Sequence, residues 1–296
     1  MAKQNLFDDE FLRRLQQLGL IAKRIAATSA ASGQRRSRTL GDGLEFADHR
    51  QYSPGDDLRF LDWPYYARME RMLLRLFHEH SEGTVGILLD CSASMSLGEV
   101  AKFDYARRTA AALAYVGMCG LDRVRLAPFS EALGEAMLTG RNRGEILDVL
   151  KFLEELPAGG RTDLAGAVSE YVHSYGETGT IFLISDMLDC QDELSESLSA
   201  LRGRKDQVVV LHIVDRQDSA PALTGALQLA AVEGPQRLSL QVTDDIISSY
   251  SERWGEFTAG VQRVCARRGA SYVQAPTAAP FERLVMQVLA KAGVLA

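Results

Sequence analysis

The sequence predicts an α/β protein built on a doubly wound, mostly parallel β-sheet. From about residue 84 onward, short apolar runs of strand length alternate with segments whose apolar residues recur at helical spacing. Residues 85–89 include a continuous apolar run, as a strand covered on both faces requires. Strands that alternate with helices lie parallel in one sheet, with helices on both of its faces.

Length and composition set the outer limits of this prediction. The 296 residues are enough for one large domain or two small ones, and 46% hydrophobic with 24% charged residues is close to average globular usage. A formal charge of −6 gives no general attraction to nucleic acid, so no nucleic-acid partner is expected. The N-terminus lacks the apolar core of a signal peptide, and no apolar run approaches the roughly 20 residues of a membrane span. We therefore expect a cytoplasmic protein without direct membrane insertion.

Residues 1–81 are expected to form an N-terminal helical and extended segment that packs on a main domain of residues 82–296. Residues 8–31 are predicted to be a helix, because apolar residues recur there at helical spacing and Asp8 suits the helix start. Residues 71–79 are predicted to be a strand.

The stretch Asp48–Trp63 mixes aromatic and charged residues without a clear period. One interpretation is a functional surface, in which His49 and Arg50 contact a partner. The other is an internal lattice of ion pairs that locks this segment onto the main domain, with Trp63 in the core. We favour the lattice, because alternating Asp and Arg beside aromatic rings can satisfy one another when buried.

The main domain is predicted to continue the alternation to its end. After the first strand, further strands are expected at residues 122–129, 180–185, 207–214 and 270–274, with a short antiparallel edge strand at 135–138. Helices are expected at residues 102–119, 144–156, 163–175, 192–201, 243–268 and 280–292. Two further strands flank the turn sequence Glu-Gly-Pro-Gln at 233–236, which predicts an inserted β-hairpin at about residues 227–242.

Oxygen-bearing side chains follow two of the buried strands. Asp90, Ser92 and Ser94 come after the first strand, Asp186 follows the strand at 180–185, and Thr162 precedes a helix between them. In open α/β sheets, ligands bind at the carboxyl ends of the strands, so these side chains are expected at one edge. Carboxylate and hydroxyl oxygens are hard ligands that suit Mg²⁺ or Mn²⁺. Because hydroxyls carry no charge, a bound ion would still attract an acidic oxygen from outside.

Simpler interpretations stand beside the metal site. Ser and Asp after a strand can cap the next helix, although Thr162 and Asp186 in register favour the metal. A nucleophilic role for Cys91 is not favoured, because neither a histidine partner nor the arginine of a phosphate-binding loop stands at a suitable spacing. The four cysteines lie far apart without a CxxC pair, which excludes a zinc knuckle.

These motifs resemble two known patterns. The order Asp90-x-Ser92-x-Ser94, then Thr162, then Asp186 resembles the metal-ion-dependent adhesion site of the von Willebrand factor A fold. The segments Glu45–Trp63 and Lys102–Arg107 resemble the signature of the bacterial family called domain of unknown function 58, over roughly residues 30–290. The resemblance implies a von Willebrand factor A-like, Rossmann-type fold whose metal captures an Asp or Glu of a partner. It also implies an association with MoxR-type AAA+ ATPases that assemble or activate other proteins.

The sequence therefore predicts a non-enzymatic, Mg²⁺-dependent protein-interaction module, with a MoxR-type AAA+ ATPase or its client as partner. Arg161 and Asp163 flank Thr162 and are candidates for partner contacts, as are His49 and Arg50. Two alternatives stay open. One is a metal-dependent hydrolase or phosphatase, which needs a general base near a metal-bound water, and Asp163 and Asp189 are the acids nearby. The other is a scaffold with a non-functional metal site.

Overall fold

The computed structural model describes residues 6–31, 40–41, 45–54, 56–78, 84–120, 122–140, 142–176, 179–188, 190–203 and 206–291. The chain divides into two compact units. The first contains Met1–Ala26 and Gly83–Ala296, and the second contains Ala27–Glu82.

The first unit is built on a six-stranded sheet with the order β11-β8-β7-β4-β5-β6. The strands are β4 (Thr84–Asp90), β5 (Arg123–Phe129), β6 (Met137–Leu138), β7 (Gly179–Ser185), β8 (Gln207–Val214) and β11 (Ser271–Pro276). Neighbouring strands run parallel, except for the edge strand β6, which is antiparallel to β5. All residues of β4 are buried, as a strand between two helical layers requires. The predicted sheet and its antiparallel edge are confirmed.

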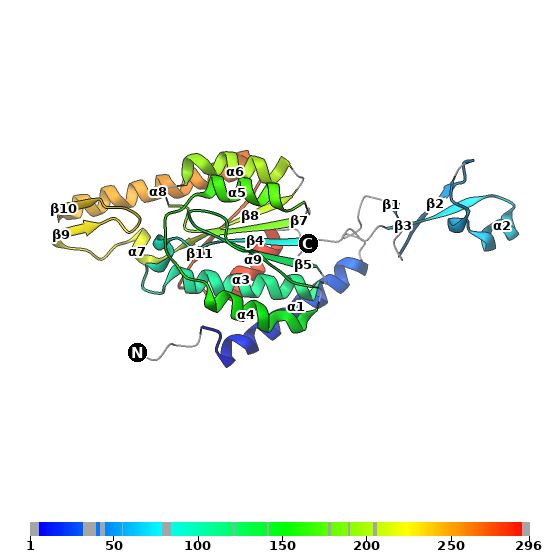
Figure 1. The fold of residues 1–296 in the computed structure, drawn as a ribbon, viewed down its shortest axis with the longest axis horizontal. Helices are drawn as coiled ribbons and strands as arrows, with labels where there is room; N and C mark the ends of the chain where they lie inside the picture. Colours follow the sequence, from blue (N-terminus) through cyan, green and yellow to red (C-terminus); the bar gives the residue numbers. More distant parts are fainter. Residues whose placement is uncertain are drawn as a thin grey trace. The chain divides into compact units, whose positions relative to one another are not determined.

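Helices cover both faces of this sheet (Figure 1). One layer contains α1 (Asp9–Ala31), α3 (Lys102–Cys119), α4 (Ile146–Glu155) and α9 (Phe281–Lys291). The other contains α5 (Leu164–Ser174), α6 (Gln191–Gly203) and α8 (Asp244–Arg267). Each layer packs its apolar side chains on the sheet as a separate core cluster, which confirms the doubly wound architecture. None of the helices in the described part of the chain is both long and apolar enough to cross a membrane.

Most of the first helix, from Asp9 to Ala26, belongs to the first unit. Phe11 is 3% exposed, and its ring centroid lies 4.9 Å from that of Phe281 in α9. The Arg108 side chain of α3 donates a hydrogen bond to the Leu6 carbonyl at 3.0 Å. The division expected at residue 81 is therefore corrected, because the core of the first unit includes Leu6, Phe7, Phe11, Leu15 and Leu18. The physical reason is that an amphipathic helix gains most of its stability by burying its apolar stripe.

An inserted hairpin precedes α8, as predicted. Its strands β9 (Gly225–Ala230) and β10 (Arg237–Val242) pair antiparallel in a two-stranded sheet, with Ala230 opposite Arg237 next to the turn. In Figure 1 the hairpin lies at the end of the first unit where α7 (Arg216–Ser219) is found and α8 begins.

The second unit holds a three-stranded antiparallel sheet with the order β1-β3-β2. Its elements are β1 (Leu40–Gly41), β2 (Glu45–Gln51), the short helix η1 (Leu58–Phe60), α2 (Trp63–Met69) and β3 (Leu73–His78). The strand predicted at 71–79 is confirmed as β3. Strand β2 was not predicted from the sequence, because its register shifts between Phe46 and Asp48, and such an irregularity breaks the period of two that reveals a strand.

Charged side chains of the second unit pair with one another. His49 lies 2.8 Å from Asp62, Arg50 lies 2.8 Å from Asp56, and Arg59 lies 2.6 Å from Asp57. The hydrogen bonds from His49 and from the Tyr65 amide lower the pKa of Asp62. These pairs are at least partly exposed and join residues of one unit. The expectation that Trp63 is a core residue is wrong, because it is 57% exposed at the start of the short helix α2.

Candidate metal centre

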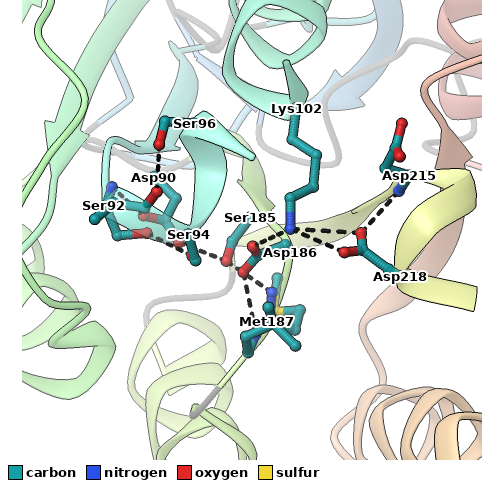
Figure 2. Close-up of polar contacts among 12 residues, drawn as sticks. Asp90, Ser92, Ser94, Ser96, Lys102, Ser185, Asp186, Met187, Asp215 and Asp218 are labelled. Atoms are coloured by element: carbon teal, nitrogen blue, oxygen red, sulfur yellow. Dashed lines mark hydrogen bonds and ion pairs between the residues drawn. The ribbon is translucent and has the colours of Figure 1, made fainter. Parts of the chain in front are cut away.

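Asp90 is the last residue of the central strand β4 and is fully buried. One carboxylate oxygen accepts a hydrogen bond from the Ser92 amide at 2.8 Å, and the other accepts one from the Ser185 hydroxyl of β7 at 2.6 Å (Figure 2). Burial raises the pKa of Asp90 to about 6. The Ser185 hydrogen bond opposes this rise, and the charge of Asp186 adds to it. The carboxylate is thus held in one orientation and is poorly solvated.

The turn after β4 places two hydroxyls beside this carboxylate. Ser92 is 0% exposed and Ser94 is 7% exposed, and their hydroxyl oxygens lie 3.1 Å apart. The short helix η2 (Ala93–Ser96) follows Ser92, whose side chain makes no capping hydrogen bond to it. The simpler interpretation of Ser92 as a helix cap is therefore not supported by the geometry.

The loop that carries Thr162 lies against this turn. The Gly159 amide donates to the Cys91 carbonyl at 2.7 Å, and the Ala93 amide donates to the Gly160 carbonyl at 3.0 Å. Gly160 has a φ of +81°, a conformation that a residue without a Cβ adopts at little cost. These bonds bring the backbone of the Thr162 loop to the turn that holds Ser92 and Ser94.

The neighbours of Thr162 have local structural roles. The carboxylate of Asp163 caps α5 by accepting a hydrogen bond from the Gly166 amide at 2.8 Å. Arg161 is exposed, and its amide donates to Glu131 at 3.3 Å. Of the four candidates for partner contacts, Arg161 and Asp163 lie on the loop of Thr162, whereas His49 and Arg50 belong to the second unit.

Asp186 follows β7 and forms a salt bridge with a residue that was not among the site residues predicted from the sequence. The ammonium of Lys102, at the start of α3, lies 2.7 Å from one Asp186 oxygen and 3.4 Å from Asp218 of α7 (Figure 2). The other Asp186 oxygen accepts a hydrogen bond from the Leu188 amide at 3.1 Å. Lys102 is 0% exposed, so its charge compensates Asp186 inside the protein. The sequence signal for this role was a lysine at the start of the predicted helix that follows the turn with Ser92 and Ser94.

A third carboxylate reaches this edge from the hairpin. Glu233, in the turn between β9 and β10, accepts a hydrogen bond from the Ser94 amide at 3.1 Å with one oxygen. Its other oxygen accepts one from the Thr162 amide at 3.3 Å. The turn could be predicted from the sequence but the role of Glu233 could not, because no local pattern links residue 233 to positions 94 and 162.

The donor set fits a divalent ion of the Mg²⁺ type. Among the described residues no three His, Cys, Asp or Glu side chains gather so that they could hold a metal, so an ion here would depend on hydroxyl oxygens. Asp90 and the hydroxyls of Ser92 and Ser94 supply hard oxygens within one turn. Lys102 compensates Asp186, and the buried Asp90 makes no salt bridge among the ion pairs of the described residues. A cation would stabilise that charge.

Two features of the edge bear on the enzymatic alternatives. Burial raises the pKa of the Cys91 thiol to about 12, so this thiol stays protonated at neutral pH, and a thiol in that state is a poor nucleophile. Asp163, one of the two acids considered as a general base, is engaged in capping α5. The other, Asp189, lies outside the described residues.

His212 of β8 lies opposite Ser185 in the sheet and is 0% exposed. One ring nitrogen lies 2.8 Å from the Tyr272 hydroxyl, and the rings of Trp254 and Phe257 lie beside it. Burial lowers the pKa of His212 to about 4 from an ordinary value of 6.5. The imidazole is therefore neutral in the folded protein at pH 7.

The stability of the protein should depend on pH through His212. The unfolded chain takes up a proton near pH 6.5 and the folded form only near pH 4, so the contribution of the neutral ring is present above pH 6.5 and is lost as the pH falls. Between pH 7.5 and 4.5, the wild type should lose about 2–3 kcal/mol more unfolding free energy than His212→Gln. Urea unfolding at both pH values measures this difference. Parallel pH profiles of the two proteins would contradict it.

Comparison with known proteins yields a relative and several remote structural neighbours. A Mycobacterium tuberculosis protein described as uncharacterized protein Rv1480 is 28% identical over 226 residues, which are 74% of this chain and 69% of the relative. BatB from Bacteroides thetaiotaomicron is similar with 16% identity and a TM-score of 0.43, covering 71% of this chain and 98% of BatB. The vWF domain of the pilus tip protein Mfa5 from Porphyromonas gingivalis has 12% identity and a TM-score of 0.34, with 73% and 97% covered.

A family model matches most of the length of the chain. The match covers residues 48–255 and carries the description "Protein of unknown function DUF58". It includes Asp90, Ser92, Ser94, Thr162 and Asp186, and it also includes Lys102 and Glu233. The chain therefore belongs to the DUF58 family.

Proposed function

We propose that this chain is a non-enzymatic, Mg²⁺-dependent protein-interaction module. Asp90, Ser92, Ser94, Thr162 and Asp186 hold a divalent ion, Mg²⁺ or Mn²⁺, and an Asp or Glu carboxylate of a partner completes its shell. The observation that carries the proposal is the buried Asp90 carboxylate, oriented by Ser92 and Ser185 beside two clustered hydroxyls.

In this proposal, different residues of the chain have different roles. The Ser92 amide and the Ser185 hydroxyl fix the Asp90 carboxylate, and Lys102 fixes Asp186. When bound, the ion would act as a Lewis acid that prefers oxygen ligands and attracts a carboxylate from a partner. Because the hydroxyl ligands are uncharged, they leave that attraction largely intact.

The partner in this proposal is a MoxR-type AAA+ ATPase or its client, which the chain meets in the cytoplasm. The support is membership of the DUF58 family, which the sequence resemblance links to such ATPases. The acidic net charge of −6 agrees with a protein partner and not with nucleic acid.

Metal binding is tested by the effect of Mg²⁺ on stability. At a free Mg²⁺ concentration 100-fold above its dissociation constant, the wild type should gain about 2.7 kcal/mol of unfolding free energy relative to EDTA. Asp90→Asn should lose this gain, because it removes the charged ligand, whereas Asp192→Asn, at an exposed position in the first turn of α6, should keep it. Thermal unfolding and calorimetric titration of Mg²⁺ measure both effects. A Mg²⁺ response that survives Asp90→Asn would reject this site.

Partner binding is tested by affinity capture in Mg²⁺ and in EDTA, with the same two variants. A partner retained only in Mg²⁺, by the wild type and Asp192→Asn but not by Asp90→Asn, is the expected result. A partner retained under every condition would move the interaction to another surface.

A further inference from the structure

The carboxylate of Glu233 is seated on two backbone amides that belong to different loops. Its two oxygens accept from the Ser94 amide at 3.1 Å and the Thr162 amide at 3.3 Å. Positions 94 and 162 lie 139 and 71 residues from Glu233 in sequence, so the contact is a tertiary one. Hydrogen bonds to a charged acceptor contribute more than neutral ones.

The two amides form a carboxylate-binding site at the edge of the sheet where the candidate metal centre lies. They belong to Ser94 and Thr162, whose side chains are two of the five proposed ion ligands. A carboxylate that accepts from both amides therefore lies against the backbone of two residues whose hydroxyls are proposed to face the ion. Under the proposed function, a partner's Asp or Glu is expected to reach this same edge. The side chain of Glu233 thus carries the same chemical group, a carboxylate, that the chain is proposed to bind on a partner.

The hairpin that delivers Glu233 is weakly anchored. Within β9 and β10, Val242 is the single buried residue, and the other strand residues are exposed or half-buried. Glu233 is the only acidic residue in positions 225–242. Segments with little buried apolar surface open at low free-energy cost. The hairpin turn can therefore leave the edge without unfolding the six-stranded sheet.

We propose that Glu233 is an intramolecular ligand of this edge, which occupies the place of the partner's carboxylate until the partner displaces it. The proposal rests on the proposed function. It adds that the edge exists in two states, one closed by Glu233 and one open to an external carboxylate. Because only the open state binds the partner, the apparent affinity is reduced by the fraction of molecules in that state.

Acetate is the probe that tests this competition. In NMR spectra of the full chain, the Ser94 and Thr162 amide signals should shift on acetate titration in Glu233→Ala. Half-saturation should come at a concentration at least about tenfold lower than in the wild type, because the internal competitor is gone. Glu131→Gln is the matched control, since Glu131 accepts a hydrogen bond from the Arg161 amide, next to Thr162 in the sequence. It should behave as the wild type, and Glu233→Gln should fall between the wild type and Glu233→Ala.

The titration is run in Mg²⁺ and again in EDTA, with chloride replacing acetate as the salt control. Equal half-saturation in the wild type, Glu131→Gln and Glu233→Ala would overturn the proposal. So would amides of Glu233→Ala that do not respond to acetate in either condition. The metal site is judged separately from the stabilisation of the wild type and Glu233→Ala by Mg²⁺. If Mg²⁺ stabilises both while acetate shows no competition, the role of Glu233 fails and the proposed function stands.

Discussion

Lys102→Met is expected to destabilise the protein by about 3–5 kcal/mol, because it leaves the buried Asp186 carboxylate without its counter-charge. Lys102 is 0% exposed and Asp186 is 2% exposed, so water cannot replace the lost ammonium. Methionine has a similar length and fills the space of the lysine stem, which separates the charge effect from a packing defect. Urea unfolding monitored by circular dichroism gives the free energy of unfolding.

A double-mutant cycle identifies the partner of Lys102. Lys102→Met combined with Asp186→Asn should be more stable than the sum of the two single losses predicts, because neither buried charge is then left alone. Asp218→Asn is the matched control. Asp218 lies 3.4 Å from the same ammonium but is 18% exposed, so its removal should cost less. Additive losses for Lys102 and Asp186, or a loss below about 1 kcal/mol for Lys102→Met, would show that the pair does not carry the stability assigned to it.

Phe11→Ala is expected to cost about 3–5 kcal/mol of unfolding free energy, because it removes a buried ring and leaves a cavity. Phe11 contacts the rings of Phe7 and Phe281, so the loss reports on the packing of α1 against α9. Thermal and urea unfolding measure the effect. A loss of this size would support the assignment of α1, up to Ala26, to the first unit.

The control for this change lies on the same helix. Leu20 is 62% exposed, so Leu20→Ala should alter the unfolding free energy by less than about 0.5 kcal/mol. If Phe11→Ala cost no more than Leu20→Ala, α1 would not be an integral part of the first unit, and the expected division at residue 81 would be restored.

The sheet could be predicted from the sequence because its signals are local. A fully buried parallel strand such as β4 needs a continuous apolar run, and the polar residues that follow it mark its carboxyl end. The hairpin turn at 233–236 and the edge strand β6 were likewise visible in short segments. The grouping of Asp90, Ser92, Ser94 and Asp186 was expected from the parallel direction of the strands, since the carboxyl ends of parallel strands meet at one edge.

Other features depended on contacts between distant residues. The register shift within β2 removed the period of two by which a strand is recognised, so β2 was missed. The docking of α1 on α9 could not be deduced from the sequence. The pattern of an amphipathic helix indicates which of its faces is buried but not which part of the protein packs against that face.

The sequence by itself determined the fold class, the strand ends and the residue types of the candidate metal centre. Only the tertiary structure decided what neutralises and what covers that centre, namely the Lys102 ammonium on Asp186 and the Glu233 carboxylate on the Ser94 and Thr162 amides. The physical reason is that strand and helix formation follow from the spacing of neighbouring residues. A buried charge pair, or a carboxylate seated on two loops, forms only after packing has joined residues that are many tens of positions apart.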